Sequence, residues 1–262
     1  AAPADCIAMQ PEVQTFQLYN NDSGTPISYA ASANQFTTDR MGASSAIVNG
    51  YLYVAGGCTT TAEICTTTLD SVQYAAIDSY GALSTAWVAG GSLPSARAWG
   101  QLESAGGTLY YIGGQSNTAT DERPEVYWAT PAAGAVTWAT VSSSFDLPDG
   151  RTQHSATTWD DRIYVTGGIA ETGGAVSNVV YVSPKMSAGG AMTSAWTTLT
   201  SFNVARSGMT AIAYANNLYI LGGYDGTNYL NDVQFASIGY KTGTIQQSGT
   251  TTVTGTGTSW TS

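Results

Sequence analysis

"NNLYILGGYDGTNYLNDV", residues 216–233, contains a short apolar strand that ends in a pair of glycines. The two asparagines before the strand tolerate the positive φ angles that a tight hairpin turn requires. One stretch of this kind indicates only a strand with a turn at each end. If it recurs at a fixed period, it indicates a protein built from repeated units.

The stretch has three relatives earlier in the chain, "GYLYVAGG" (50–57), "GTLYYIGG" (107–114) and "DRIYVTGG" (161–168). The second glycines recur at intervals of 57, 54 and 55 residues. Each has a tyrosine four residues before it and an arginine seventeen residues before it. The tyrosines are Tyr53, Tyr110, Tyr164 and Tyr219, and the arginines are Arg40, Arg97, Arg151 and Arg206. The chain therefore contains four units of one repeat.

Each unit is predicted to form a four-stranded antiparallel sheet. A turn pair such as Asn49-Gly50 separates the first strand from the second, and the second strand is almost wholly apolar. Such a strand is buried on both faces, so another sheet must lie on each side of it. A third strand follows a polar loop, and a tryptophan marks the fourth; these tryptophans are Trp87, Trp138, Trp196 and Trp260. Sheets stacked face to face around an axis make a β-propeller.

The pattern of arginine, hairpin, tyrosine before Gly-Gly, polar loop and late tryptophan resembles the kelch repeat over roughly residues 12–262. The resemblance implies an all-β, kelch-type β-propeller. Its four full blades would be residues 40–96, 97–150, 151–205 and 206–262. Residues 1–39 would contribute a half blade, with Val13 in its third strand and Tyr29 near its fourth. We expect the tail after residue 241 to form a long hairpin of third and fourth strands, because "TTTVT" and Trp260 suit a strand; a linker is the alternative.

No first and second strands for the half blade appear in the sequence. Either the chain is a piece of a longer one, or its open edge pairs with further chain or with another subunit. An uncovered half blade would expose strand edges and apolar faces.

Charged residues make up 10% of the chain, against roughly 25% in an ordinary domain. The net charge of −10 argues against nucleic acid as a partner, because binding to phosphates needs dense Lys and Arg. No apolar run is long enough to span a membrane. The Thr- and Ser-rich, lysine-poor composition favours an extracellular or cell-surface location.

Cys58 and Cys65 flank a six-residue loop and are predicted to form a disulfide; two free thiols are the alternative. Cys6 is left as a free thiol or pairs outside this sequence. The cysteine spacing does not fit a zinc site, so we predict no metal ligands.

Catalytic residues are not predicted, and neither is a cofactor. His154 is the single histidine, and it stands where the kelch resemblance implies a structural histidine opening the first strand. Copper-radical oxidases on kelch-like propellers need two histidines. Asp121, Glu122 and Glu125 lie in a loop after a glycine pair, where we expect solvated charges, and Asp225 is expected to be a turn residue.

The repeated arginines are the candidate ligand-binding residues. Symmetry would gather Arg40, Arg97, Arg151 and Arg206 around the propeller axis, where guanidinium groups suit carboxylate, sulfate or sialic-acid-like groups. Trp99 and Met209 would add contact surface. The alternative is structural: the arginines bond backbone carbonyls between sheets, and Trp99 and Met209 belong to the core.

Three functions follow from this reading. The first is an extracellular, non-catalytic binding or adhesion module that presents loops to a protein or glycan ligand. The second is a sugar-handling enzyme such as a sialic-acid mutarotase-like protein. The third is a structural repeat segment of a larger surface assembly. Sequence alone does not name the ligand.

Overall fold

The structure is a computed structural model that describes residues 34–59, 65, 67–117, 121–171, 173–190 and 192–238, and the strands at 14–15, 30–31, 244–248 and 252–256. The described residues form antiparallel sheets, with a short 3-10 helix η2 (Ser143–Phe145). None of their helices has the length and apolar character needed to cross a membrane. The prediction of an all-β fold is confirmed.

Four sheets follow one another along the chain and are here named blades 1 to 4, with strands A to D in chain order. Blade 1 consists of β3 (Ser44–Val48), β4 (Tyr51–Ala55), β5 (Ser71–Ala76) and β6 (Val88–Ser92). Blade 2 consists of β7 (Gln101–Ala105), β8 (Thr108–Ile112), β9 (Val126–Ala129) and β10 (Ala139–Thr140). Blade 3 consists of β12 (Ser155–Trp159), β13 (Arg162–Thr166), β15 (Val180–Val182) and β16 (Thr197–Leu199). Blade 4 has three strands among the described residues, β17 (Thr210–Tyr214), β18 (Asn217–Leu221) and β19 (Val233–Ser237).

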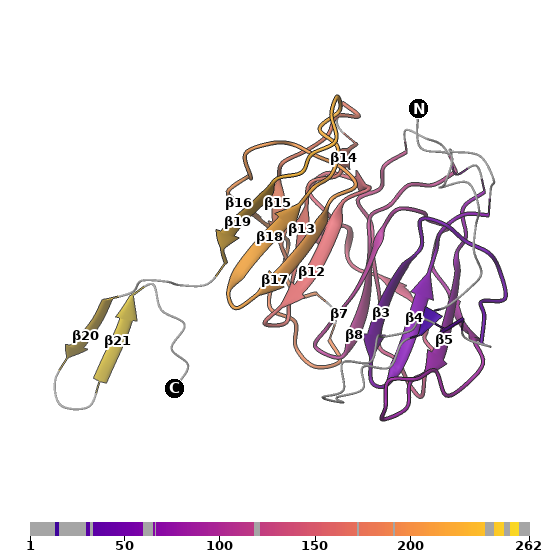
Figure 1. Cartoon of the computed structure of the whole chain (residues 1–262). Coiled ribbons are helices and arrows are strands. Elements are labelled where there is room, and N and C mark those ends of the chain that lie inside the picture. Colours follow the sequence, from indigo (N-terminus) through magenta and orange to yellow (C-terminus); the bar gives the residue numbers. More distant parts are fainter. Residues whose placement is uncertain are drawn as a thin grey trace, which may run out of the picture.

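The repeat predicted from the tyrosines is present in the strand register. Each tyrosine is the third residue of strand B, as Tyr53 is in β4 and Tyr219 is in β18. Strands A of successive blades contact one another, β3 with β7, β7 with β12 and β12 with β17, and the sheets lie side by side in chain order (Figure 1). The blades therefore share one hub, as a kelch-type propeller requires.

The core lies between the blades. The Tyr53 and Tyr110 side chains are fully buried, and each donates a hydrogen bond to a carbonyl in the C–D connection of the next blade. Tyr53 donates to Gly134 O at 2.8 Å, and Tyr110 donates to Gly190 O at 2.7 Å. Trp196 packs with Tyr110 in the apolar cluster between blades 2 and 3. Trp138 likewise packs against the cluster that contains Tyr53. The interfaces between blades 1 and 2 and between blades 2 and 3 thus join a tyrosine of one blade to a tryptophan of the next, as in the sequence prediction of an aromatic residue between sheets.

Shorter pairs complete the topology. β1 (Gln14–Thr15) pairs with β2 (Ala30–Ala31), in the segment where a half blade of two strands was predicted. β11 (Arg151–Thr152) pairs with β14 (Ile169–Ala170). Val13 and Tyr29 lie outside the described residues, and the blade boundaries stay a prediction.

The tail differs from the expected hairpin of third and fourth strands. β21 (Thr252–Thr256) pairs with β20 (Thr244–Ser248), and β19 pairs only with β18 among the described strands. β20 and β21 are neighbours in the sequence, and pairing of neighbouring segments carries a small entropic cost. Trp260, which was predicted to mark strand D of blade 4, lies outside the described residues.

The outer face of blade 4 is apolar and exposed. Ile212 is 50% exposed, Tyr214 68% and Phe235 68%, whereas the corresponding faces of blades 1 to 3 are covered by the next blade. The sequence analysis expected such a face on the uncovered half blade, whereas the structure shows one on blade 4.

Candidate binding face

Two sets of connections meet at one edge of the propeller, here called the arginine edge. Strands A and B are antiparallel, so the start of strand A and the end of strand B lie at the same edge. The repeated arginines lead into strand A, and the B–C loops begin after the glycine pairs. In Figure 1 this is the edge at which β14 is labelled. The A–B turns and C–D connections lie at the opposite edge.

The glycine pairs are crowded by the backbone of the next blade. Gly57 has a φ of +94° and donates its N–H to Arg97 O at 2.8 Å. A Cβ on Gly56 would stand 2.5 Å from the same carbonyl oxygen. The bond recurs as Gly114 to Arg151 at 2.7 Å and Gly168 to Arg206 at 2.9 Å. The crowding predicted at the end of strand B is therefore real, and its source is the arginine carbonyl of the following blade.

The guanidinium groups point into their own blades. The four arginines are 7%, 3%, 2% and 0% exposed, in chain order. Arg40 Nη1 donates to Gly56 O at 2.9 Å and to Ser71 O at 3.2 Å. Burial lowers the pKa of Arg40. The backbone at the start of strand C thus satisfies this charge.

Arg97, Arg151 and Arg206 use side-chain acceptors as well. Arg97 Nη2 donates to the Tyr127 hydroxyl at 2.9 Å, and Arg151 Nη2 donates to the Tyr181 hydroxyl at 3.1 Å. Both nitrogen atoms of the Arg206 fork bond the Asp232 carboxylate, at 2.6 and 3.0 Å. These bonds favour the structural alternative for the arginines. A ligand-binding role for them stays a prediction.

Trp99 and Met209 do not occupy equivalent positions. Met209 stands three residues after Arg206, is 6% exposed and packs over Gly167, so it belongs to the core. Trp99 stands two residues after its arginine with a φ of +59°, which is rare for a bulky residue. Its half-buried indole lies over Gly42.

Trp99 belongs to a chain of backbone hydrogen bonds at the hub. Trp99 N–H donates to Gly42 O at 2.8 Å, Gln153 N–H to Trp99 O at 3.1 Å and Gly208 N–H to Gln153 O at 2.9 Å. All four residues stand two positions after a repeated arginine and have positive φ. The left-handed conformation at Trp99 is therefore a property of this repeat position, occupied elsewhere by glycine or glutamine.

The predicted disulfide joins Cys58 to Cys65 in the B–C loop of blade 1. Both residues are buried, and they pack with Ala98 and the half-buried Met41 and Trp99. The bond fixes a loop of the arginine edge beside the Trp99 indole. Cys6 lies outside the described residues.

The sequence analysis did not single out an exposed aromatic pair in the B–C loop of blade 4. The Tyr224 and Tyr229 ring centroids are 5.2 Å apart, and Tyr229 is 80% exposed. Asp225 is a turn residue as predicted: its Oδ1 accepts the N–H groups of Thr227 at 2.7 Å and Asn228 at 2.6 Å, which lower its pKa. The repeat signal masked these tyrosines because they follow the glycine pair, where the blades share no residue pattern.

The remaining candidates are His154 and the carboxylates in the B–C loop of blade 2. His154 is buried against Gly113 and Gly168, and desolvation with the nearby Arg151 charge lowers its pKa to about 3. Glu122 was expected to be solvated but is 5% exposed, because its backbone bridges with Gln115 inside the loop.

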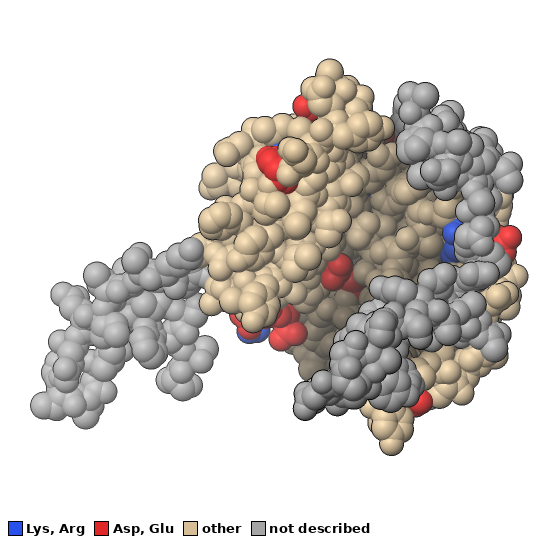
Figure 2. All heavy atoms as spheres, in the orientation of Figure 1, with Lys and Arg blue, Asp and Glu red and all other residues tan. Residues whose placement is uncertain are grey.

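The other two carboxylates of that loop pair with arginines. Asp121 pairs with Arg123, and Glu125 pairs with Arg97. In the part of the chain that the structure describes, no three His, Cys, Asp or Glu side chains group as metal ligands. Figure 2 shows few charged side chains on the view drawn, with the acidic ones scattered.

Comparisons with known proteins agree with the repeat. The family description "KLHDC2/KLHL20/DRC7 Kelch-repeats domain" matches residues 101–259. The chain is 29% identical over 194 residues to Kelch-like protein terF of Aspergillus terreus (strain NIH 2624 / FGSC A1156), a match covering 68% of this chain and 38% of that protein. It is 28% identical over 176 residues to Kelch repeat protein M-T8 of Myxoma virus (strain Lausanne), covering 67% of this chain and 30% of that protein. The match covers about a third of the length of these relatives. Four equivalent repeats and a family match over more than half of the chain show that this protein belongs to the kelch-repeat family.

Proposed function

We propose that this protein is a non-catalytic binding module that holds a protein ligand at the arginine edge. Kelch domains typically bind proteins, which supports a protein ligand. The four B–C loops begin at this edge. Backbone hydrogen bonds to the next blade fix where the loops of blades 1 to 3 start, and bonds within the blade, such as Tyr224 N–H to Ser207 O at 2.9 Å, fix the loop of blade 4.

The exposed Tyr224–Tyr229 pair is the observation that carries the proposal. Tyrosine offers a large apolar ring and a polar tip at low conformational cost, and it is enriched among the residues that dominate binding energy. The loop that bears the pair is held by the Asp225 turn and by the hydrogen bond from Leu230 N–H to Gly223 O at 2.8 Å. A rigid loop loses less entropy on binding.

The test compares two tyrosines of similar exposure on opposite edges. Tyr229 is 80% exposed at the arginine edge, and Tyr80 is 83% exposed in the C–D connection of blade 1. A photoreactive amino acid at each position identifies the neighbours in the native source. The captured protein is then titrated against the parent chain, Tyr229→Ala and Tyr80→Ala. We expect Tyr229→Ala to weaken binding roughly tenfold or more and Tyr80→Ala to leave it unchanged. Equal affinities for all three would contradict the proposal.

An extracellular or cell-surface location is part of the proposal. The Cys58–Cys65 bond and the sparse charge support it, because structural disulfides persist in oxidising compartments. Mass spectrometry of protein trapped with a thiol-blocking reagent in its native source tests this location. Free Cys58 and Cys65 thiols would contradict it.

A glycan ligand remains the alternative for the same edge, since exposed aromatic rings also pack on sugars. A glycan array that includes sialylated glycans separates the two ligands. Binding to one glycan class that Tyr229→Ala abolishes would replace the protein ligand in this proposal.

Pairing through the exposed face of blade 4 stays a prediction. Sedimentation velocity over a range of concentrations tests it with the parent chain and Phe235→Glu. We expect association of the parent that the charged substitution removes, and a parent that stays monomeric at every concentration would contradict pairing between copies.

A further inference from the structure

The B–C loop of blade 4 combines two tyrosine rings with a carboxylate. Tyr224 and Tyr229 form a tilted pair with ring centroids 5.2 Å apart, and Asp225 follows Tyr224 directly in the chain. Because Asp225 Oδ1 accepts two backbone N–H groups of the loop, its carboxylate is fixed within the loop that bears the rings. Aromatic faces attract cations, and a carboxylate adds the opposite charge, so this combination suits a cationic group.

The negative charge of Asp225 is not neutralised by an ion pair in the part of the chain that the structure describes. The other carboxylate of the same loop, Asp232, is occupied by the Arg206 fork and by Gln234 Nε2, which donates to it at 3.0 Å. The backbone N–H groups lower the pKa of Asp225, so it is ionised at neutral pH. Asp225 therefore keeps its charge for a partner.

The rest of the arginine edge is acidic at its surface as well. The repeated arginines are buried and bond within their own blades, so they add little positive surface. The one further cation among the described residues of this edge, Arg123, pairs with Asp121. Three exposed carboxylates of this edge have no ion pair among the described residues, namely Asp39, Asp70 and Glu171. The burial of the arginines thus leaves carboxylates as the main charges that a partner meets.

The loop of blade 4 lies against the B–C loop of blade 3, which bears Glu171. A Cβ on Gly226 would stand 3.7 Å from Val176 Cγ2. In Figure 1 the two loops lie side by side at the edge where β14 is labelled. The aromatic pair and the carboxylates of two neighbouring loops therefore belong to one surface.

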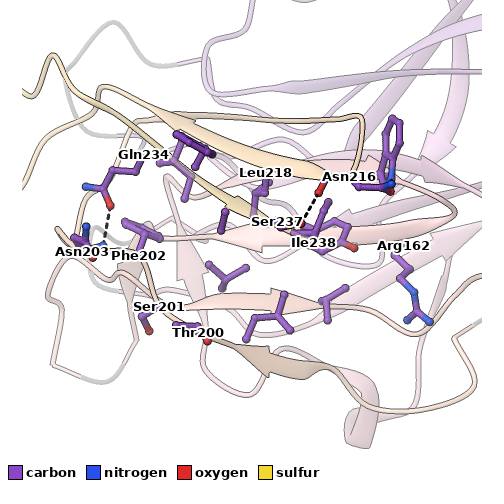
Figure 3. Close-up of a pocket in the computed structure, with 18 of the residues that line it drawn as sticks. Arg162, Thr200, Ser201, Phe202, Asn203, Asn216, Leu218, Gln234, Ser237 and Ile238 are labelled. Carbon is purple, nitrogen blue, oxygen red and sulfur yellow. Dashed lines mark hydrogen bonds between the residues drawn. The ribbon is translucent and has the colours of Figure 1, made fainter. Parts of the chain in front are cut away.

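The other two cations among the described residues lie at the opposite edge. Arg162 follows the A–B turn of blade 3, and Lys185 lies in the C–D connection of the same blade. Figure 3 shows Arg162 at the end of the pocket between blades 3 and 4 that is far from Asn203 and Gln234, which lie toward the arginine edge. The two edges therefore present different charges to a partner.

We propose that the loop formed by Tyr224, Asp225 and Tyr229 binds a basic side chain, Lys or Arg, of the protein partner. This rests on the function proposed above and adds the chemistry of the ligand. The tyrosine rings pack on the apolar stem and cationic head of that side chain, and Asp225 supplies the opposite charge. The sign is the reverse of the anionic ligand that the repeated arginines suggested, because those arginines are buried.

Selection from a phage-displayed library of random short peptides tests the charge of the ligand. The full chain is immobilised, and the enriched peptides are sequenced. We expect enrichment of Lys and Arg. The basic peptides are then synthesised and titrated against the parent chain and its variants. Enrichment of uncharged or acidic peptides, or no enrichment, would overturn the proposal.

Asp78 provides a matched control for Asp225. Asp78 Oδ1 accepts the N–H groups of Tyr80 and Ala82, both at 2.9 Å, in a turn of the opposite edge. Asparagine keeps this acceptor in either turn, and each substitution removes one negative charge. The two variants therefore have the same net charge and differ only in where the charge was lost.

We expect Asp225→Asn to weaken binding of the basic peptides roughly threefold or more and Asp78→Asn to leave it unchanged. Added salt should shrink the difference, because it screens exposed charges. Equal weakening by both substitutions would mean only a general attraction of cations to an acidic protein, and it would refute a site at this loop.

Tyr229→Ala separates this proposal from the proposed function. Peptides that bind less tightly to Tyr229→Ala but equally well to Asp225→Asn and the parent would leave the proposed function standing and refute the cationic ligand. Peptides that bind all variants equally would refute both.

Discussion

The backbone N–H of Gly57 donates a hydrogen bond of 2.8 Å to the carbonyl oxygen of Arg97 in the next blade. This bond joins the two most regular features of the repeat, the glycine pair of one unit and the arginine of the following unit. The arginine therefore has two structural roles, one within its own blade and one between blades. Its side chain bonds strand C of its own blade, and its carbonyl accepts from the blade before.

Two glycine substitutions test this contact between the glycine pair and the arginine carbonyl. A Cβ on Gly113 would stand 2.7 Å from Arg151 O, whereas a Cβ on Gly222 has only Leu230 O, at 3.4 Å. Both residues have a positive φ, so alanine strains both backbones by about 1–2 kcal/mol. We expect Gly113→Ala to cost roughly 3 kcal/mol or more and Gly222→Ala only the strain. Urea unfolding measures both values, and equal losses would show that the carbonyl contact is unimportant.

Arg206→Ala is expected to destabilise the fold by about 3 kcal/mol, because it removes a buried ion pair and leaves Gly222 O and Asp232 without the hydrogen bonds that Arg206 donates. The exposed pair of Lys185 with Asp160 provides the control, and Lys185→Ala should change the free energy of unfolding by less than about 1 kcal/mol. Chemical unfolding of both variants makes the comparison. A stable Arg206→Ala variant that has lost ligand binding would instead support the ligand-facing role.

Glu103 should make stability depend on pH. It lies on strand A of blade 2, accepts a hydrogen bond from Thr158 Oγ1 at 2.8 Å, and burial raises its pKa to about 7. The folded state then holds a proton that the unfolded chain releases, so the free energy of unfolding falls as pH rises from about 4.5 to 7. We expect Glu103→Gln to be more stable than the parent at pH 8 and about equal to it at pH 4. A difference that is the same at both pH values would contradict the raised pKa.

Asp232 should make stability depend on pH in the opposite direction to Glu103. The Arg206 fork and Gln234 hold its pKa below the usual range. Its contribution to stability is therefore present at neutral pH and is lost as pH falls through the acidic range. Asp232→Asn should flatten the acid limb of the unfolding curve, and an unchanged acid limb would show that the ion pair does not contribute.

Reduction of the Cys58–Cys65 bond should lower stability by about 2 kcal/mol, because the bond closes a short loop in the unfolded chain. The double variant Cys58→Ser with Cys65→Ser should show the same loss and no further response to reductant. Thermal unfolding with and without dithiothreitol measures this. A parent chain that unfolds identically in both conditions would contradict a structural role.

The sequence predicted the features that depend on repetition. Tyr53 and its equivalents, the glycine pairs and the turn residues recur because every blade imposes the same backbone and packing requirements. The Cys58–Cys65 bond was predictable from spacing alone.

Other features depend on side-chain direction, which the repeat does not encode. Whether Arg97 faces the axis or strand C is decided by acceptors such as Tyr127, which has no equivalent spacing rule. The hub position of Trp99 was hidden because glycine, tryptophan and glutamine share it without a common property. A hairpin in the tail was expected, but the repeat does not encode that β20 and β21 pair with each other and that neither pairs with β19 among the described strands.

The hydrogen bonds through Gly42, Trp99, Gln153 and Gly208 link each blade only to its neighbours. Blades linked in this way behave as a one-dimensional array. Separating a blade at one end breaks one interface, whereas separating an inner blade breaks two. Fraying should thus start at the flank formed by β17, β18 and β19, and amide exchange should slow from there toward blade 2.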